Sequence, residues 1–397
     1  MLNILNLIGR KEALFDADLI KLDSELTEII SKSSFLILGG AGSIGQAVAK
    51  QIFKRNPSLL HIVDLSENNM TELVRDLRST YGYISGEFKT FTIDIGSDIF
   101  NAFMRNSSGY DYVLNFSALK HVRSEKDPYT LLRMIETNIF NTDQSITQSI
   151  NNGSQKYFCV STDKATNPVN LMGGTKRIME KSLMSRSTEI PISTARFANV
   201  AFSDGSLLHG FNQRIQKQQP IVAPKDVKRY FVSPEESGQL CMLAAIFGEN
   251  RDVFFPKLSE KLHLITFSEI AISYLNELNY EPFICENEEE ARRKAKDLIG
   301  SKKWPCLFTD SDTTGEKGFE EFFMKDEILD MNKYHGIGII KNEPNQLDRF
   351  DLIDLRNKYQ KWINDNDLSK AEITAVLIQL LPELNYIDKG KYLDDKM

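Results

Sequence analysis

The segment FLILGGAGSIGQAVAKQIF, Phe35 to Phe53, limits the choice of fold more than any other part of this sequence. Four apolar residues that read as a buried strand lead directly into Gly39, Gly42 and Gly45, and a helical pattern follows. The missing side chains allow a tight turn and let a pyrophosphate approach the positive end of the helix, where Ser43 and Ile44 join the predicted site. The segment therefore predicts a strand, a phosphate-binding turn and a helix.

The alternation of strand and helix continues well beyond this segment. The apolar runs LLHIVD, FKTFTID, YVLNFSA, YFCVST and ISTARFA are separated by stretches of helical length and period. Short buried strands that alternate with helices predict an α/β fold, a doubly wound parallel sheet of the Rossmann type that is covered on both faces. A smaller mixed α/β substrate domain and added helices at both ends complete the expected architecture.

The expected domain organisation has four parts. Residues 1–32 are expected to form a helical N-terminal extension, 33–200 an NAD-binding domain, 201–345 mainly a substrate-binding domain interleaved with the sheet, and 346–397 a C-terminal helical tail. The charge-rich stretch ENEEEARRKAKDLIGSKK, about 285–305, reads as a solvated helix within the third part.

Two acidic residues at predicted strand ends indicate which dinucleotide is bound. Asp64 ends the second strand at the distance from Gly45, about 20 residues, that is expected of an acid bonded to a ribose 2′-hydroxyl. A carboxylate there repels a 2′-phosphate, and no arginine follows it directly, so NAD is favoured over NADP. Asp94, with Ile95 beside it, is placed to meet the adenine edge.

Charge and cysteine content exclude several classes of partner. The 48 Lys and Arg against 55 Asp and Glu give a net charge of -7, so no broad basic surface for nucleic acid or an anionic membrane is expected. The 4 cysteines lie far apart without a CxxC pair, which predicts neither a metal site nor a disulfide framework. Without about 18 consecutive apolar residues or a signal segment, a cytoplasmic protein with no membrane partner is expected.

The stretch VSTDKATNPVNLMGGTKR, Val160 to Arg177, carries the candidate catalytic residues. It begins as a fifth strand that runs out at Thr162, Asp163 and Lys164, at the carboxyl edge of the sheet where ligands bind in such folds. Met172 and Lys176 follow as M-x-x-x-K on the next helix.

In short-chain dehydrogenase/reductases the corresponding pair is Y-x-x-x-K, and further segments extend the resemblance. NFSALKHV, ETNIFNT, STDKATNPVNLMGGTK, ARFANVAFSDGS and TTGEK resemble, in this order, segments of UDP-N-acetylglucosamine (UDP-GlcNAc) 4,6-dehydratases, which are extended members of that superfamily. The resemblance covers roughly residues 33–325 and includes a subgroup with methionine in place of the tyrosine. The longer form of the chain resembles soluble dehydratases that begin legionaminic-acid-type and related surface-glycan pathways.

The resemblance implies a three-part reaction with NAD. C4 of the hexose is oxidised, water is eliminated across C5 and C6, and the hydride returns to C6, which leaves a 4-keto-6-deoxy sugar and regenerated NAD. It implies Lys164 as the base at C5, Asp163 as the acid at the C6 hydroxyl, Thr162 as a partner of the C4 hydroxyl and Lys176 as a partner of the nicotinamide ribose. A lysine acts as a base only when its surroundings lower its pKa.

Further contacts follow from the same resemblance. It implies that Lys120 lies near both cofactor and substrate, that Ser117, Ala118 and Val200 contact the cofactor, and that Asn199, Ser203, Gly205, Ser206 and Arg229 receive the nucleotide-sugar diphosphate. His121 reads as a structural hydrogen-bonding residue. The family often has R-P-G-E-K where this chain has Thr313 to Lys317, so an arginine contact to the diphosphate is missing.

Several alternatives stay open at this point. Met172 cannot take a proton, so the C4 hydroxyl loses its proton to Asp163, to a bound water or to the ribose network. Loss of the tyrosine favours retention of configuration at C5, with inversion as the alternative. A nucleotide-sugar 4-epimerase, which normally needs the tyrosine, and a non-catalytic NAD-binding protein are the other candidate functions, and a homo-oligomer is expected.

Overall fold

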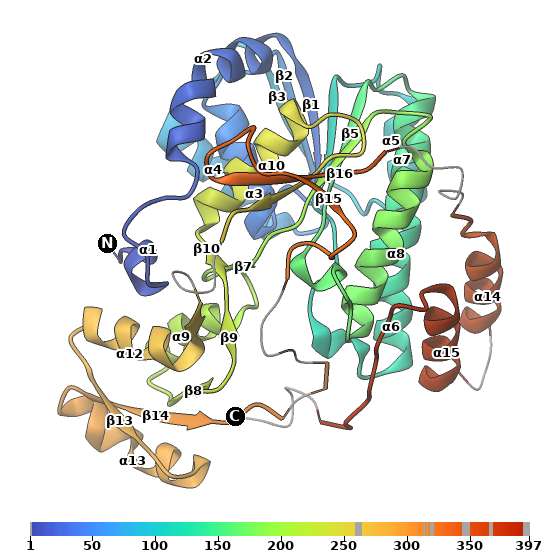
Figure 1. The fold of residues 1–397 in the computed structure, drawn as a ribbon. Coiled ribbons are helices and arrows are strands. Elements are labelled where there is room, and N and C mark those ends of the chain that lie inside the picture. Colours follow the sequence, from blue (N-terminus) through green and yellow to red (C-terminus); the bar gives the residue numbers. More distant parts are fainter. Residues whose placement is uncertain are drawn as a thin grey trace.

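The computed structural model describes residues 2–258, 264–312, 314–315, 317, 321–343, 350–364 and 368–391. The strands of its large sheet are β1 (Ser34–Leu38), β2 (Leu59–Asp64), β3 (Glu87–Thr92), β4 (Tyr112–Asn115), β5 (Lys156–Val160), β6 (Ile192–Ala195), β11 (Val253–Pro256), β15 (Ile328–Asp330) and β16 (Ile337–Lys341). Over these residues the 9-stranded order is β15-β16-β11-β6-β5-β4-β1-β2-β3 (Figure 1). All neighbours from β11 to β3 pair in parallel, and β16 and β15 join antiparallel at one edge.

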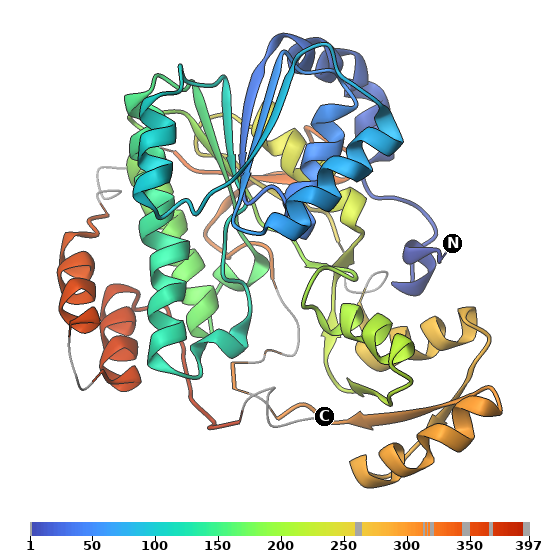
Figure 2. The same cartoon turned by 180° about the vertical axis from the view of Figure 1, so that it is seen from behind.

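Helices cover both faces of this sheet, as Figures 1 and 2 show from opposite sides. Phe35 and Ile37 of β1 belong to the apolar cluster that includes α2 (Asp16–Lys32), α3 (Ser43–Phe53), α4 (Glu67–Tyr81) and α10 (Pro234–Phe247). Leu36 and Leu38 belong to the cluster on the other face, with α5 (Asp98–Arg105), α7 (Asn141–Asn151) and α8 (Leu171–Arg186). A strand buried on both faces is continuously apolar. The predicted α/β Rossmann-type fold is confirmed.

Several predicted strands extend too far at their carboxyl ends. FKTFTID, YVLNFSA, YFCVST and ISTARFA each continue two or three residues beyond the observed strand. The first of these extra residues still bond to the neighbouring strand, as the amides of Phe116 and Ser161 do by donating to the carbonyl oxygens of Leu38 and Ala195, and the chain then continues into loops at the carboxyl edge of the sheet. This edge therefore carries most of the predicted site.

A smaller sheet lies beside the large one. It pairs β13 (Glu281–Ile284), β14 (Lys303–Thr309) and β8 (Ile221–Pro224) in parallel, in the order β13-β14-β8. Its apolar cluster includes residues of α1 (Ile4–Leu7), α9 (Leu207–Gln216) and α12 (Phe267–Glu277). The short pairs β7 (Asn199–Val200) with β10 (Phe231–Val232) and β9 (Lys228–Arg229) with β12 (Ile265–Thr266) complete this part of the described chain.

The charge-rich stretch forms the helix α13 (Glu288–Gly300), as predicted. Lys294 forms an ion pair with Glu290 at 2.6 Å, one turn earlier, and all residues of the helix except two are exposed or half-buried. Ala291 and Ala295 are the buried positions. The boundaries between the domains stay a prediction of the sequence.

The C-terminal helices α14 (Ile353–Ile363) and α15 (Lys370–Leu380) pack against α6 (Pro128–Ile135) and α8, beside the large sheet (Figure 1). Trp362 and Leu377 lie in an apolar cluster with Leu131 and Ile178. The C-terminal helices therefore extend the helical layer that contains α8. The chain that follows them runs close to the N-terminal turn of α8.

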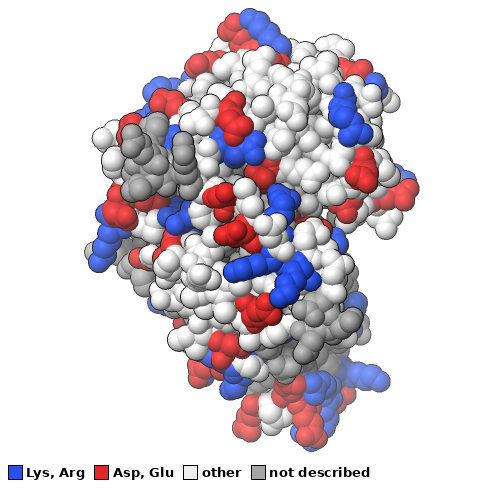
Figure 3. Space-filling view, turned by 90° about the vertical axis from the view of Figure 1, so that its right-hand side faces the viewer, with Lys and Arg blue, Asp and Glu red and all other residues white. Residues whose placement is uncertain are grey.

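Acidic and basic side chains are interspersed over the face shown in Figure 3, and neither sign forms a broad patch there. Among the described helices, none has the length and apolar character that crossing a membrane requires.

Candidate active site

The glycine turn after β1 is shaped by close backbone contacts. Gly39 has φ +69°, and a Cβ on it would lie 2.6 Å from the Ser117 amide nitrogen. A Cβ on Gly45 would lie 2.3 Å from the carbonyl oxygen of Gly39. Gly42 starts α3 without any side-chain cap, and a Cβ on it would meet nothing closer than 3.5 Å. The amides of the first helical turn are therefore open to a pyrophosphate, and the turn fits a dinucleotide.

The acidic residue after β2 lies next to this turn. Asp64 accepts hydrogen bonds from the amides of Ala41 at 2.9 Å and Ser66 at 2.8 Å, one on each carboxylate oxygen. Each oxygen can accept a further bond, so the carboxylate can both shape the turn and bind a ribose diol. Asp94 is exposed and accepts from the Gly96 amide at 3.0 Å, while Ile95 is buried beside it.

Replacing Asp64 with alanine is expected to weaken NAD binding by about 10–100-fold and NADP binding much less, because charge-assisted hydrogen bonds to the ribose are lost. Asp64→Asn is the matched control for the turn, since its side-chain oxygen can still accept from the Ala41 amide. Dissociation constants for both dinucleotides measure the effect. An unchanged preference in Asp64→Ala would show that Asp64 does not contact the ribose.

Thr162, Asp163 and Lys164 form one hydrogen-bonded group at the end of β5. The Thr162 hydroxyl donates to Oδ1 of Asp163 at 2.9 Å, and Nζ of Lys164 donates to the same oxygen at 3.2 Å. Asp163 is 1% exposed, and its Oδ2 is buried without a hydrogen-bond partner in the described part of the chain. The hydroxyl and Nζ of the lysine thus share Oδ1, and Oδ2 is the carboxyl oxygen without a described partner.

The helix α8 brings Met172 and Lys176 to the same strand end. Met172 is buried and adds no ionisable group. Nζ of Lys176 donates to the carbonyl oxygen of Val160, the last residue of β5, at 2.8 Å, and burial lowers the pKa of this lysine. Since the ammonium group has three N–H donors, Lys176 can bind a ribose hydroxyl in addition to the Val160 carbonyl oxygen.

Glu125 fixes the N-terminal turn of α8, a role that sequence reasoning missed. Its Oε2 accepts from the amides of Leu171 at 2.7 Å and Met172 at 3.2 Å. The side chain is fully buried, Oε1 has no hydrogen-bond partner among the described residues, and burial raises the pKa of Glu125 to about 7. No spacing in the sequence indicates this contact, because it joins two loops that meet only in the folded chain.

Glu125 is expected to make stability fall as pH rises through about 7. The folded protein holds the proton up to that pH, whereas the unfolded chain releases it near 4.5, so protonation favours folding below 7. Glu125→Gln keeps an acceptor for both amides and removes this titrating proton. The change in the free energy of unfolding between pH 5.5 and 8 should therefore be smaller in the variant than in the unaltered protein, by about 1–3 kcal/mol. Urea denaturation at both pH values measures it, and identical pH dependence in the two proteins would contradict the assignment.

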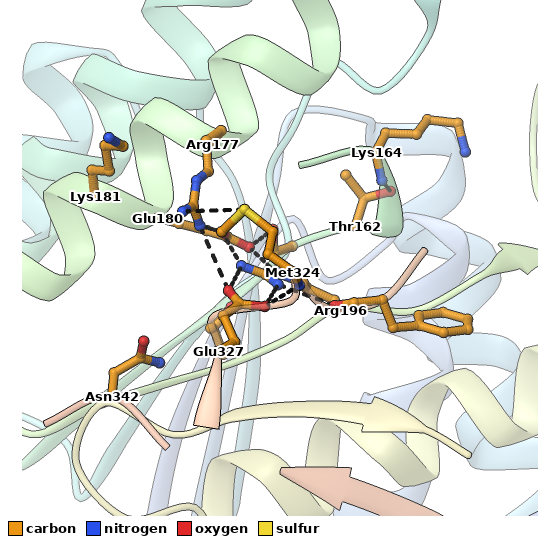
Figure 4. A network of polar contacts seen from close by, with 12 residues as sticks. Thr162, Lys164, Arg177, Glu180, Lys181, Arg196, Met324, Glu327 and Asn342 are labelled. Atoms are coloured by element: carbon orange, nitrogen blue, oxygen red, sulfur yellow. Dashed lines mark hydrogen bonds and ion pairs between the residues drawn. The ribbon is translucent and has the colours of Figure 1, made fainter. Parts of the chain in front are cut away.

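A buried ion-pair network lies beside the group of Thr162, Asp163 and Lys164 (Figure 4). Arg196, 1% exposed, pairs with Glu180 and with Glu327, each at 2.9 Å, and Arg177 pairs with Glu180 at 3.0 Å. Burial alone would raise the pKa of Glu180, but the charges and hydrogen bonds of its partners, Arg196 foremost, lower it to about 2.

The network reaches the Thr162 to Lys164 group through Ser161. The Ser161 hydroxyl donates to Oε1 of Glu180 at 2.6 Å, so it fixes the residue that immediately precedes Thr162. In Figure 4 the side chain of Lys164 points away from the charged cluster. The network therefore holds the loop in place without pairing with the lysine.

The segment between β7 and α9 connects the glycine turn to the predicted substrate residues. The Asp204 amide donates to Oγ of Ser43 at 2.9 Å, and Nζ of Lys120 donates to Oγ of Ser203 at 3.4 Å. Gly205 has φ +70°, and a Cβ on it would lie 2.8 Å from the His121 ring, so His121 has a packing role here. The remaining predicted residues of this region are Ala118, which is half-buried, Val200, which is buried, and Asn199, whose side-chain Nδ2 donates to the Tyr230 carbonyl oxygen at 3.5 Å.

A cavity of about 440 Å³ opens beside this segment. Four of the predicted residues line it, namely Lys164, Gly205, Ser206 and Arg229. Arg123, Arg214 and Lys391 also line it and were not predicted. Single basic residues on helices and near a chain end usually read as solvated, so the sequence contains no signal for them.

Arg229 forms part of the inner wall of this cavity. It is buried and donates to the carbonyl oxygens of Lys228 at 2.9 Å and Lys317 at 3.0 Å. Lys317 in turn donates to the Thr166 carbonyl oxygen at 2.8 Å. Thr313 and Glu316 of the predicted TTGEK segment lie outside the described residues.

Comparison with known proteins identifies one family. Residues 35–342 match the family described as polysaccharide biosynthesis protein. Among curated relatives, an uncharacterized membrane protein of Methanocaldococcus jannaschii is 25% identical over 91% of this chain and 99% of its own length. Capsular polysaccharide biosynthesis protein CapD of Staphylococcus aureus is 27% identical over 88% of this chain, which spans 55% of CapD. A UDP-glucose 4-epimerase of Rickettsia typhi is 27% identical over 68% of this chain and 82% of its own length.

Solved structures with the same fold are more distant in sequence. Pen from Bacillus thuringiensis superposes with a TM-score of 0.65 at 22% identity, over 89% of this chain and 99% of Pen. DesIV, a dTDP-glucose 4,6-dehydratase from Streptomyces venezuelae whose structure holds NAD, superposes with a TM-score of 0.56 at 14% identity, over 84% of this chain and 97% of DesIV. These likenesses establish the fold.

Proposed function

Because this chain belongs to the polysaccharide biosynthesis protein family, we propose that it is a nucleotide-sugar 4,6-dehydratase that acts on UDP-GlcNAc. The observation that carries the proposal is the group at the end of β5. Thr162 and Lys164 both donate to Oδ1 of Asp163, while the buried Oδ2 has no hydrogen-bond partner among the described residues. A dehydration across two neighbouring carbons needs such a pair, a base for one carbon and an acid for the hydroxyl on the next.

NAD is the cofactor of this enzyme. It would be held by the open amides after Gly42, by the Asp64 carboxylate and by Lys176. The dinucleotide supplies reversible two-electron chemistry, which oxidises C4 of the sugar and reduces C6 at the end of the cycle. The cofactor is regenerated in each turnover.

The chain's own residues move the protons. The Asp163 carboxylate accepts the proton of the C4 hydroxyl when C4 is oxidised. The ketone at C4 makes the C5 proton acidic, and Nζ of Lys164, which lines the cavity and acts as the neutral amine, removes it. The Asp163 carboxyl then donates its proton to the C6 hydroxyl, which leaves as water when its C–O bond breaks. Thr162 orients the C4 hydroxyl, while the buried position of Asp163 keeps bulk water away from the reacting atoms.

Retention at C5 is part of the proposal. If Lys164 both removes and returns the C5 proton, the proton comes back on the same face of the ring. Inversion needs a donor on the opposite face, and Met172 has no ionisable group to provide one. The product is then UDP-2-acetamido-2,6-dideoxy-α-D-xylo-hexos-4-ulose, an intermediate suited to surface-glycan or legionaminic-type acid synthesis.

A nucleotide-sugar 4-epimerase is the second candidate function. The likeness to the UDP-glucose 4-epimerase of Rickettsia typhi supports it, since the two chains share 27% identity. Epimerisation oxidises and reduces the same carbon, so it needs no base at C5 and loses no water. Met172 disfavours it, because the resembled superfamily uses a tyrosine there to move the proton of the C4 hydroxyl.

Incubation of the purified protein with NAD and UDP-GlcNAc distinguishes these functions. The dehydratase gives a 4-keto-6-deoxy sugar nucleotide by NMR, with no net NADH. The epimerase gives UDP-N-acetylgalactosamine, with the C6 hydroxyl intact. Release of one NADH per sugar would contradict both reactions, since each returns its electrons to the sugar.

A further inference from the structure

The chain after α15 reaches the cavity at Lys391. The Asn385 amide donates to the Pro168 carbonyl oxygen at 2.9 Å, in the loop that precedes α8. The Lys389 amide donates to Oγ1 of Thr314 at 3.0 Å, and the Thr314 amide donates to the Lys391 carbonyl oxygen at 3.0 Å. In Figures 1 and 2 this segment leaves α15 and runs toward the smaller sheet. Thr314 and Lys391 both line the cavity.

The cavity lining carries an excess of positive charge. Its described basic residues are Arg123, Lys164, Arg214, Arg229 and Lys391, and Asp310 is its acidic residue. Like charges gathered around a partly enclosed space repel one another, and an anion placed among them relieves that repulsion. The lining therefore selects a ligand with more than one negative charge.

The basic residues differ in how far they are already engaged. Lys164 bonds to Asp163, and Arg229 bonds to two backbone carbonyl oxygens. Lys391 pairs with Asp312 at 2.8 Å, but both side chains are largely exposed, so this pair is weak and easily exchanged. The side chain of Arg214 has no hydrogen bond or ion pair within the described residues, and its Nε is buried without a partner. A guanidinium group in this position suits the paired oxygens of a phosphate.

Arg214 lies in the part of the cavity formed by α9 and the smaller sheet. Its neighbours in the lining include Pro220 and Val222, around the start of β8, and Phe267, the first residue of α12. Apolar surfaces of this kind suit a nucleoside, whereas the reacting sugar must reach Lys164. A diphosphate joins the nucleoside to the sugar in a sugar nucleotide, so it would pass the cationic side chains between them.

We propose that Arg214 and Lys391 bind the diphosphate of the sugar nucleotide, so that the C-terminal segment is a working part of the substrate site. The proposal rests on the proposed function, because it takes the cavity as the place of a nucleoside diphosphate sugar. Residue 391 lies outside residues 35–342, which match the family. The proposed Lys391 contact thus comes from a segment outside the part of the chain that matches the family.

Calorimetric titration of the full chain with UDP and with UMP tests the proposal. Arg214→Gln is expected to weaken UDP binding by about 10–100-fold and Lys391→Met by about 3–10-fold, as for loss of charge-assisted hydrogen bonds. Both changes should bring the dissociation constants for UDP and UMP closer together, because UDP loses a contact that UMP does not make. The matched controls are Lys217→Met, at the exposed end of α9, and Lys389→Met, exposed in the same C-terminal segment, and both should bind UDP within 2-fold of the unaltered protein.

The outcomes separate the two proposals. UDP binding that is unchanged in both variants, or equal losses for UDP and UMP, would overturn the diphosphate contact and leave the proposed function standing. Failure of the unaltered protein to bind UDP would overturn both. Lys391 is exposed near the chain end, so Lys391→Met decides the matter even if Arg214→Gln does not fold.

Discussion

Replacing Lys164 with methionine is expected to lower kcat by about 10³-fold or more, because the C5 proton loses its base. The side chain of Lys164 lines the cavity and is 18% exposed, and its carbon stem can be matched by methionine without loss of packing. The fold and the dinucleotide site should therefore survive. The effect should appear in kcat and leave NAD affinity within 2-fold, since Lys164 acts on the sugar.

Two measurements make this prediction specific. Exchange of the C5 hydrogen with deuterium oxide should stop in Lys164→Met, and NAD binding should be retained. Lys325→Met, an exposed lysine outside the cavity, is the matched control and should keep full activity. A Lys164→Met protein that exchanges the C5 hydrogen at the native rate would remove Lys164 from the role of base.

Replacing Arg196 with methionine is expected to destabilise the fold by about 3–5 kcal/mol, because Glu180 and Glu327 are left as neighbouring buried carboxylates. The depressed pKa of Glu180, about 2, has the same origin. Ionised Glu180 therefore contributes to the free energy of unfolding above about pH 4.5, and this contribution is lost as pH falls toward 2. In Arg196→Met the decrease in the free energy of unfolding on acidification should be much smaller than in the unaltered protein.

Urea denaturation measures the difference, and two further variants control it. Adding Glu180→Gln and Glu327→Gln to Arg196→Met removes the two carboxylate charges that have lost Arg196 and should recover part of the stability. Lys181→Met breaks a pair with Glu383 in which both side chains are about one third exposed, so it should cost less than about 1 kcal/mol. If Arg196→Met lowers the free energy of unfolding by less than about 1 kcal/mol, the buried network does not stabilise the fold as proposed.

The layered fold could be predicted because its signals are local. Each buried strand is a short apolar run, as in FLIL and LLHIVD, and the helices between them show their own period. The ends of the strands could not be predicted as well. Residues such as Ala118 and Thr162 continue an apolar or β-branched pattern in the sequence, but in the fold they lie in loops beyond the strand ends.

The candidate site was predictable where its residues are neighbours in the chain. The glycine turn, the Thr162 to Lys164 group and the spacing of Met172 and Lys176 are all readable in short segments. Glu125 and Arg196 act on these segments from other loops, and only tertiary structure brings them there. Arg214 and Lys391 are 177 residues apart and carry no local signal, although the missing arginine at Thr313 indicates that a cation must come from elsewhere.

Proton NMR of the reaction in deuterium oxide measures the C5 step directly. The protein is incubated with NAD and UDP-GlcNAc, and spectra are recorded from the first turnovers. The proposed chemistry predicts a 4-keto-6-deoxy sugar nucleotide with one deuterium at C5, the D-xylo configuration and no net NADH. A product that keeps its C6 hydroxyl and its original C5 hydrogen would contradict the dehydratase and favour the epimerase.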